Sequence, residues 1–159
     1  MSQILKIVAV VVGVFLAQLY LAEAMEVWQI RPDFILVLLV YISARYGRIP
    51  GILFGFTAGL LQDAMGSLSV LGANALAKSV IGYTLGTLNG TLAVWTPRIV
   101  NVYVYGTLLG HAIIYQTVMS QGLDLPIGML LARIGLEAFI SSVIVTGLRF
   151  LFPLVPSQV

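Results

Sequence analysis

Long apolar segments separated by short polar ones most limit what this chain can fold into. A helix that crosses a membrane needs about 20 predominantly apolar residues. Six such segments can be traced along the 159 residues, and they leave only a handful of residues for each connection. The pattern predicts transmembrane helices over about residues 4–22, 30–46, 48–64, 73–94, 98–120 and 127–152.

The composition excludes an ordinary soluble domain. Apolar residues make up 60% of the chain and charged residues 9%, whereas soluble domains carry roughly 25% charged residues. The chain has no cysteine, which excludes disulfides, a thiol nucleophile and a cysteine-ligated zinc site. A net charge of +2 is too small to indicate a nucleic-acid partner. We therefore expect one all-α polytopic membrane domain over residues 1–159, without cofactor or metal.

Three of the six segments leave alternatives open. Ile4 to Ala22 resembles a signal peptide because Lys6 lies near its start. It is longer than the roughly 7–15 residues of a signal-peptide core, so we expect a retained helix. The second segment contains only 11 uninterrupted uncharged residues, at 34–44, and the third, counted after Pro50, contains 12, at 51–62. We expect full spans with polar ends, the alternative being a pair of half-helices as at transporter binding sites.

The distribution of lysine and arginine predicts the orientation. Loops on the cytoplasmic side of a membrane protein carry an excess of these residues. Outside the apolar segments, the side that holds the N-terminus has five of them and the opposite side has Arg31 alone. We therefore expect both termini in the cytoplasm. The five are Lys6, Arg45, Arg48, Arg98 and Arg149.

Glycines recur at a spacing of four residues. The chain holds 16 glycines, which form six pairs at this spacing, where random placement would give about 1.6. Glycines spaced by four lie on one helix face and let another helix approach closely. The pattern predicts helix-packing faces, used within the bundle or to dock another membrane protein. The residues are Gly51, Gly55, Gly59, Gly82, Gly86, Gly90, Gly106 and Gly110.

Several polar residues lie within or at the ends of the apolar segments, where a charge costs about 2.5–3.5 kcal/mol. Arg133 and Glu137 are four residues apart and can pair on one helix face. Three interpretations stay open: a salt-bridge network joining helices, recognition of a partner at the outer leaflet, or a proton or substrate pathway. The expected cluster is Asp63, Lys78, His111, Arg133 and Glu137.

The sequence contains no motif typical of an enzyme. It lacks a Gly-x-Ser-x-Gly elbow, a P-loop and a His-Glu-x-x-His helix. A single histidine with separated carboxylates forms no recognisable metal-ligand set. We expect a protein without catalytic, cofactor-binding or metal-binding residues.

Two stretches of the chain resemble a known family. Pro32-Asp33 precedes an apolar run, and Gly55-Phe56-Thr57-Ala58-Gly59-Leu60-Leu61-Gln62-Asp63 is followed by Gly66 and Leu71-Gly72. With these residues, the chain resembles MreD, the integral-membrane rod shape-determining protein of bacteria. The matching stretch runs from about 31 to 90. Its family-motif residues are Pro32, Asp33, Asp63, Gly66 and Gly72.

The resemblance implies a non-catalytic scaffold in the inner membrane. Its implied partner is MreC, bound through that protein's transmembrane helix and periplasmic base. The wider complex would contain MreB filaments, a RodA-type glycosyltransferase and a penicillin-binding transpeptidase, and would build the lateral cell wall. The resemblance also implies a six-helix fold similar to the substrate-binding subunits of energy-coupling-factor vitamin transporters.

That fold similarity supplies a rival hypothesis, a vitamin-binding transport subunit. Such a protein would need a pocket of about 300–1,000 Å³ open to the outer side. A third hypothesis is a homo-oligomeric structural protein, because Gly-x-x-x-Gly faces also support self-association. Residues that could line a vitamin pocket are Trp28, Asn74, Lys78, Tyr83 and Arg133.

Overall fold

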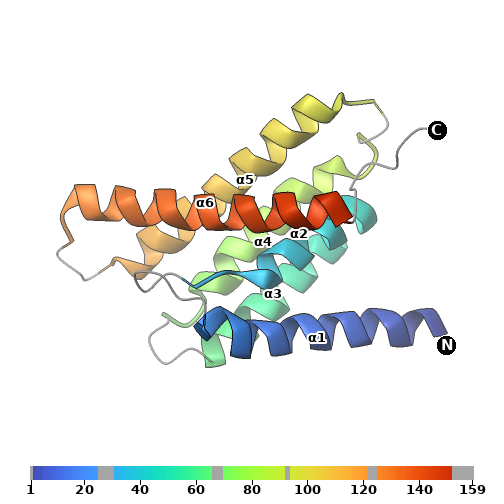
Figure 1. Cartoon of the computed structure of the whole chain (residues 1–159), viewed down its shortest axis with the longest axis horizontal. Helices are drawn as coiled ribbons and strands as arrows, with labels where there is room; N and C mark the ends of the chain where they lie inside the picture. Colours follow the sequence, from blue (N-terminus) through green and yellow to red (C-terminus); the bar gives the residue numbers. More distant parts are fainter. Residues whose placement is uncertain (1, 25–30, 66–69, 92–93, 122–124, 152–159) are drawn as a thin grey trace.

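The computed structural model describes residues 2–24, 31–65, 70–91, 94–121 and 125–151. Within these ranges the chain is all-helical, with six α-helices, one short 3-10 helix and no strand, which confirms the predicted class. Successive helices alternate in direction, so the start of α1 and the end of α6 lie at the same end of the bundle (Figure 1). The elements are α1 (Ser2–Ala24), α2 (Phe34–Tyr46), α3 (Arg48–Met65), α4 (Ala73–Leu85), η1 (Gly86–Leu88), α5 (Pro97–Met119) and α6 (Ile127–Leu151).

The fourth helix is shorter than predicted. The apolar pattern predicts a helix over 73–94, but α4 ends at Leu85 and continues as the 3-10 turn η1. Gly90 then adopts a φ of 100°, in the left-handed region that glycine enters without the steric penalty of a Cβ. Hydropathy did not separate the glycine-rich end of this helix from the turn that follows it.

Helix α2 lies at the centre of the molecule. Its N-cap is Asp33, whose side chain accepts a hydrogen bond of 2.9 Å from the backbone N–H of Leu36. It ends at Gly47, which has a φ of 93° and turns the chain directly into α3. None of the residues 34–44 is exposed. The core around α2 consists of Leu36, Val37, Leu39, Val40, Ala44, Ile81, Leu85, Leu88, Val100, Val104, Leu108 and Val145.

Helix α6 lies on the outside and is strongly apolar. Over Ile127–Arg149 it is long and apolar enough to cross a membrane, and only 17% of the 18-residue window that meets this test is buried. Among the described residues it is the one helix that meets this test of length and composition, beside shorter apolar helices at Ala9–Tyr20 and Phe34–Tyr46. Six transmembrane spans therefore stay a prediction.

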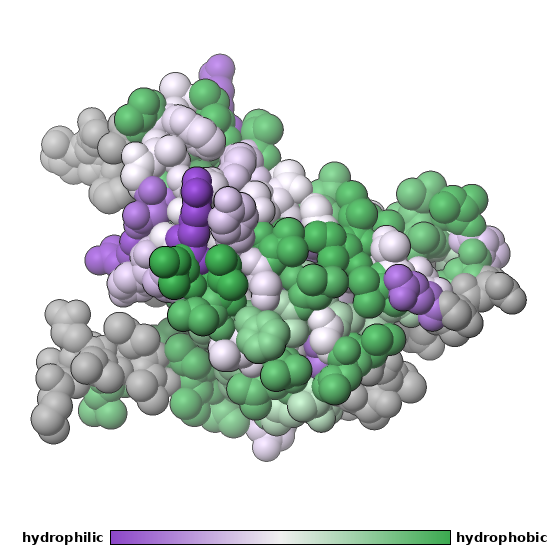
Figure 2. Space-filling model, turned by 180° about the vertical axis from the view of Figure 1, so that it is seen from behind, coloured by the Kyte–Doolittle hydropathy of each residue, from purple (hydrophilic) through white to green (hydrophobic). Residues whose placement is uncertain are grey.

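Four arginines lie at the end of the bundle that holds the start of α1 and the end of α6. Arg45 is in the last turn of α2 and Arg149 in the last turn of α6, while Arg48 and Arg98 are in the first turns of α3 and α5. Figure 2, seen from behind, shows hydrophilic side chains gathered toward this end and hydrophobic ones over the middle of the molecule. The molecule thus has an apolar middle with one basic end.

Candidate functional site

Five of the predicted interface glycines join α3 to α4. A Cβ added at any of them would lie closer than 3.0 Å to the backbone of the facing segment. At Gly59 it would lie 2.6 Å from the carbonyl oxygen of Asn74. Two helix backbones approach this closely only where side chains are absent. These glycines are therefore used for packing inside the molecule. They are Gly51, Gly55, Gly59, Gly82 and Gly86.

The other three predicted glycines have different surroundings. Gly90 lies in the turn after η1, with no atom within 4 Å of an added Cβ. Gly106 on α5 is exposed and also has open space at that position. At Gly110 an added Cβ would meet only the side-chain Cδ1 of Ile81, at 3.9 Å. None of the three makes a backbone-to-backbone helix contact of the α3–α4 kind.

Asp63 holds the beginning of α4 against the end of α3. Its carboxylate accepts hydrogen bonds from the backbone N–H groups of Gly72 at 2.9 Å, Asn74 at 3.1 Å and Ala75 at 3.2 Å. It also accepts one from the side-chain amide of Asn74 at 2.8 Å. The first N–H groups of a helix have no partner within the helix, and the negative charge suits the positive end of the helix dipole. Asp63 therefore acts as the N-terminal cap of α4 from another helix.

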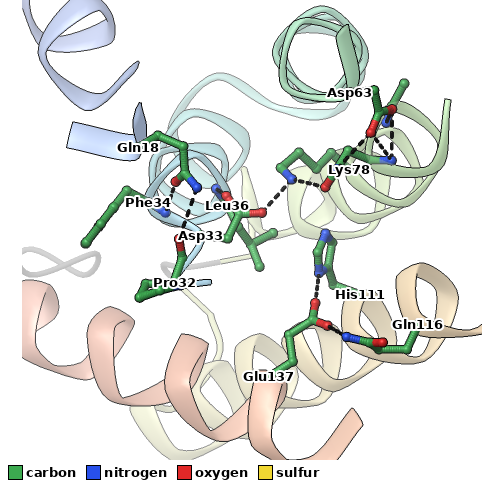
Figure 3. A network of polar contacts seen from close by, with 12 residues as sticks. Gln18, Pro32, Asp33, Phe34, Leu36, Asp63, Lys78, His111, Gln116 and Glu137 are labelled. Carbon is green, nitrogen blue, oxygen red and sulfur yellow. Dashed lines mark hydrogen bonds and ion pairs between the residues drawn. The ribbon is translucent and has the colours of Figure 1, made fainter. Parts of the chain in front are cut away.

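Lys78 is fully buried and connects α4 to α2 (Figure 3). Its amine lies 2.5 Å from Oδ2 of Asp33 and donates a hydrogen bond of 2.8 Å to Oδ1 of Asn74. One of the interpretations left open by the sequence was a salt-bridge network with Lys78 that joins the third, fourth and sixth helices. The ion pair instead reaches α2, because Asp33 at its N-cap is within reach, and Asn74 relays the contact to Asp63.

A glutamine that sequence reasoning missed attaches α1 to the rest of the molecule. The side-chain amide of Gln18 donates to the carbonyl of Pro32 at 3.1 Å, and its oxygen accepts from the backbone N–H of Phe34 at 2.8 Å. Figure 3 shows Gln18 next to Asp33, at the start of α2. The available signal was a lone amide within an otherwise apolar segment, which indicates a hydrogen-bonded position but not its partner.

Glu137 of α6 is held by two side chains of α5. His111 Nδ1 lies 3.2 Å from Oε1 of Glu137, and the amide of Gln116 donates to Oε2 at 2.7 Å. From the sequence alone, Arg133, one turn away on α6, could also pair with Glu137. Both carboxylate oxygens bond to side chains of α5, because residue 137 faces the bundle. Sequence reasoning also missed Gln116.

The ring of His111 has further surroundings besides Glu137. Its ring stacks on Tyr115, with centroids 6.0 Å apart and planes 12° from parallel. In the described part of the chain, the buried Nε2 has no hydrogen-bond partner. Figure 3 shows the ring between Glu137 and the Lys78 side of the network.

Together these contacts form a buried polar cluster that joins helices. Within the described ranges, no group of three or more histidine, aspartate or glutamate side chains could hold a metal. The carboxylates of Asp33, Asp63 and Glu137 all accept hydrogen bonds from another helix or cap one. Breaking such pairs leaves a buried charge without compensation, so the cluster fixes how the helices lie against each other.

A shallow groove lies between α5 and α6. Its volume is about 360 Å³. The hydroxyls of Tyr105 and Thr146 join its two sides at 2.9 Å. None of the residues predicted for a vitamin pocket lines it; Asn74 and Lys78 are buried in the polar cluster, and Trp28 lies outside the described residues. The groove is lined by Tyr105, Phe139, Ser142, Val143 and Thr146.

Four of the five family-motif residues take part in these contacts. The carbonyl of Pro32 accepts from Gln18, Asp33 pairs with Lys78, and Asp63 caps α4. Gly72, with a φ of 98°, donates its N–H to Asp63. The fifth, Gly66, lies outside the described residues.

Comparison with known proteins places the whole chain in one family. No curated protein and no solved structure matches the chain, so the expected likeness to energy-coupling-factor subunits stays a prediction. The family model described as rod shape-determining protein MreD matches residues 1–155, well beyond the stretch of about 31–90 that carried the resemblance. The chain therefore belongs to the MreD family of bacterial rod shape-determining membrane proteins.

Proposed function

We propose that this protein is a non-catalytic scaffold of the inner membrane that binds MreC and supports lateral cell-wall synthesis. Its wider partners would be MreB, a RodA-type glycosyltransferase and a penicillin-binding transpeptidase. The observation that carries the proposal is the uneven use of glycine. Beside the α3–α4 glycines, the space that a side chain would take is filled by the backbone of the facing segment. Gly106, Gly128 and Gly135 on α5 and α6 instead have no atom within 4 Å of an added Cβ.

The open glycines of α6 lie on a continuous exposed face. Helical spacing places six residues of α6 on the same side, and all six are exposed. The half toward the start of α6 carries small residues, and the other half borders the groove with α5. A single transmembrane helix can pack closely on such a small-residue strip. The face consists of Gly128, Ala132, Gly135, Phe139, Val143 and Thr146.

The neighbouring face of α5 extends the same surface. Val102, Gly106, Leu109 and Ile113 are exposed and lie within one side of the helix, next to Tyr105 of the groove. We propose that the transmembrane helix of MreC lies along this α5–α6 surface. The four arginines at the end that holds the start of α1 and the end of α6 support an orientation with that end in the cytoplasm.

Site-directed photocrosslinking in membranes tests the proposal. A photoreactive residue at Val143 or Gly135 on the α5–α6 surface is expected to capture MreC. The same probe at Leu53 of α3, which is 60% exposed on another side, serves as the matched control and is expected to capture little protein. Equal capture of MreC from both sides, or capture only from Leu53, would contradict the proposed surface.

A steric block gives a second test. Gly106→Leu enters open space, so it is expected to leave folding intact and weaken co-purification with MreC. Leucine at Gly55 or Gly86 is unsuitable for this purpose, because a side chain there collides with the backbone of the facing segment and would unfold the protein first. Capture of a second copy of this chain instead of MreC would favour the homo-oligomer.

A further inference from the structure

A column of exposed apolar side chains runs beside the α3–α4 contact, directly below two arginines. On α3 the exposed residues include Ile49, Phe56 and Leu60, and on α4 Leu76, Val80 and Tyr83. Helical spacing places both sets on the same side of the glycine contact. Because the glycines bring the two helices so close, the column forms one continuous apolar surface.

The arginine at the head of the column is held in place by the facing helix. The guanidinium of Arg48 lies over the ring of Tyr83, 5.3 Å from its centroid. Stacking occupies the face of a guanidinium and leaves its edge N–H groups available, in a geometry that suits bidentate binding of a phosphate. Arg48 is exposed, so those N–H groups can reach a ligand.

The turn between α2 and α3 fixes a second arginine next to the first. Arg45 and Arg48 flank the left-handed Gly47, and both are exposed. The side-chain amide of Asn89 donates to the carbonyl of Arg45 at 2.5 Å, which ties the turn to the segment after η1. The six acidic side chains of the sequence all lie outside residues 36–62 and 64–123. The turn is therefore positively charged, with no carboxylate from its own or the facing segment to neutralise it.

The dimensions match one lipid molecule. From Arg48 to Leu60 the column is about 18 Å long at 1.5 Å per residue, and one leaflet of a bilayer core is about 15 Å thick. We propose that an anionic phospholipid binds here, with its headgroup phosphate at Arg45 and Arg48 and one acyl chain along the α3–α4 column. The positive charge of the turn favours an anionic headgroup over a zwitterionic one. The apolar column favours a lipid over free phosphate, because only a lipid has an acyl chain to place along it.

Lipid titration of the purified full-length protein in a mild detergent tests this inference. Phosphatidylglycerol is expected to raise the Tm and to remain bound in native mass spectrometry, at concentrations where phosphatidylcholine with the same acyl chains does neither. Inorganic phosphate is expected to have no effect, because it cannot use the column. Equal responses to the two lipids, or a full response to inorganic phosphate, would overturn the proposal.

Two variants locate the site. Arg48→Gln is expected to weaken phosphatidylglycerol binding about fivefold, the effect of one basic residue near an anionic surface. The matched control Arg31→Gln removes the same charge at the opposite end and is expected to bind normally. If both variants lose the same amount of phosphatidylglycerol binding, the effect comes from the net charge of the protein, and the proposed site is refuted. Unchanged lipid binding in Arg48→Gln, with loss of a cytoplasmic protein partner, would show a protein interface instead.

Discussion

The close contact between α3 and α4 predicts a large effect for a single added methyl group. In Gly59→Ala the new Cβ would lie 2.6 Å from the carbonyl oxygen of Asn74 and 2.7 Å from backbone atoms of Ala75. Ordinary van der Waals contact begins near 3.4 Å, so the helices must separate by about 0.8 Å at this point. Both neighbours are backbone atoms and cannot rotate away. The separation also pulls Asn74 away from Asp63, which caps α4.

Overpacking of this kind lowers the free energy of unfolding by about 1–3 kcal/mol. Replacing a helical glycine by alanine raises it by up to about 1 kcal/mol, because alanine has the higher helix propensity. We expect Gly59→Ala to lower the free energy of unfolding by about 1–2 kcal/mol. Thermal or denaturant unfolding of the purified protein in detergent, followed by circular dichroism, measures it. The control is Gly106→Ala, where the methyl enters open space and stability should be unchanged or higher. If Gly59→Ala is as stable as Gly106→Ala, the glycine contact does not hold the two helices.

Three further predictions concern the buried polar contacts. Lys78→Met leaves Asp33 buried and unpaired and should destabilise the protein by about 3–5 kcal/mol. Adding Asp33→Asn should restore part of this loss, and additive losses in the double variant would argue against the pair. Glu137→Leu removes the partner of His111 and Gln116 and should cost about 2–4 kcal/mol, whereas Tyr105→Phe, at the exposed bond between the same helices, should cost under about 1 kcal/mol. Gln18→Leu should loosen α1, seen as faster proteolysis near its end with an unchanged helix content, and protection equal to wild type would count against the attachment.

The helices themselves were largely predictable from the sequence, because changes of polarity mark their ends. Arg48 begins α3, Ile127 begins α6, and Pro97, after the N-cap Thr96, begins α5, each at or beside a predicted boundary. The end of α4 was not predictable in this way, since Gly90 has no polar side chain to mark a boundary, yet it adopts a left-handed φ in the turn after η1. Hydropathy measures how strongly a segment prefers lipid to water. It does not show where glycine, which can adopt a left-handed φ, allows the chain to turn after a helix.

The partners within the polar cluster were predictable only in part. The sequence indicated that Lys78, His111 and Glu137 must face protein, a cavity or the membrane interface, because charges are costly in lipid. It did not indicate that Glu137 would meet His111 and Gln116 of α5. That choice depends on how each helix is rotated about its own axis, which long-range packing sets. The same holds for the glycines, whose spacing predicts a close contact without saying which helix supplies the other side.

The central position of α2 affects how the protein fits bilayers of different thickness. A helix bordered by acyl chains must match their length, or else tilt or deform the bilayer. With 13 residues and about 20 Å of length, α2 is too short for a core of about 30 Å, yet none of its residues 34–44 is exposed to that medium. Neighbouring helices set its surroundings instead. Hydrophobic mismatch therefore acts on the outer helices, and the central one can remain short in a thick or a thin membrane.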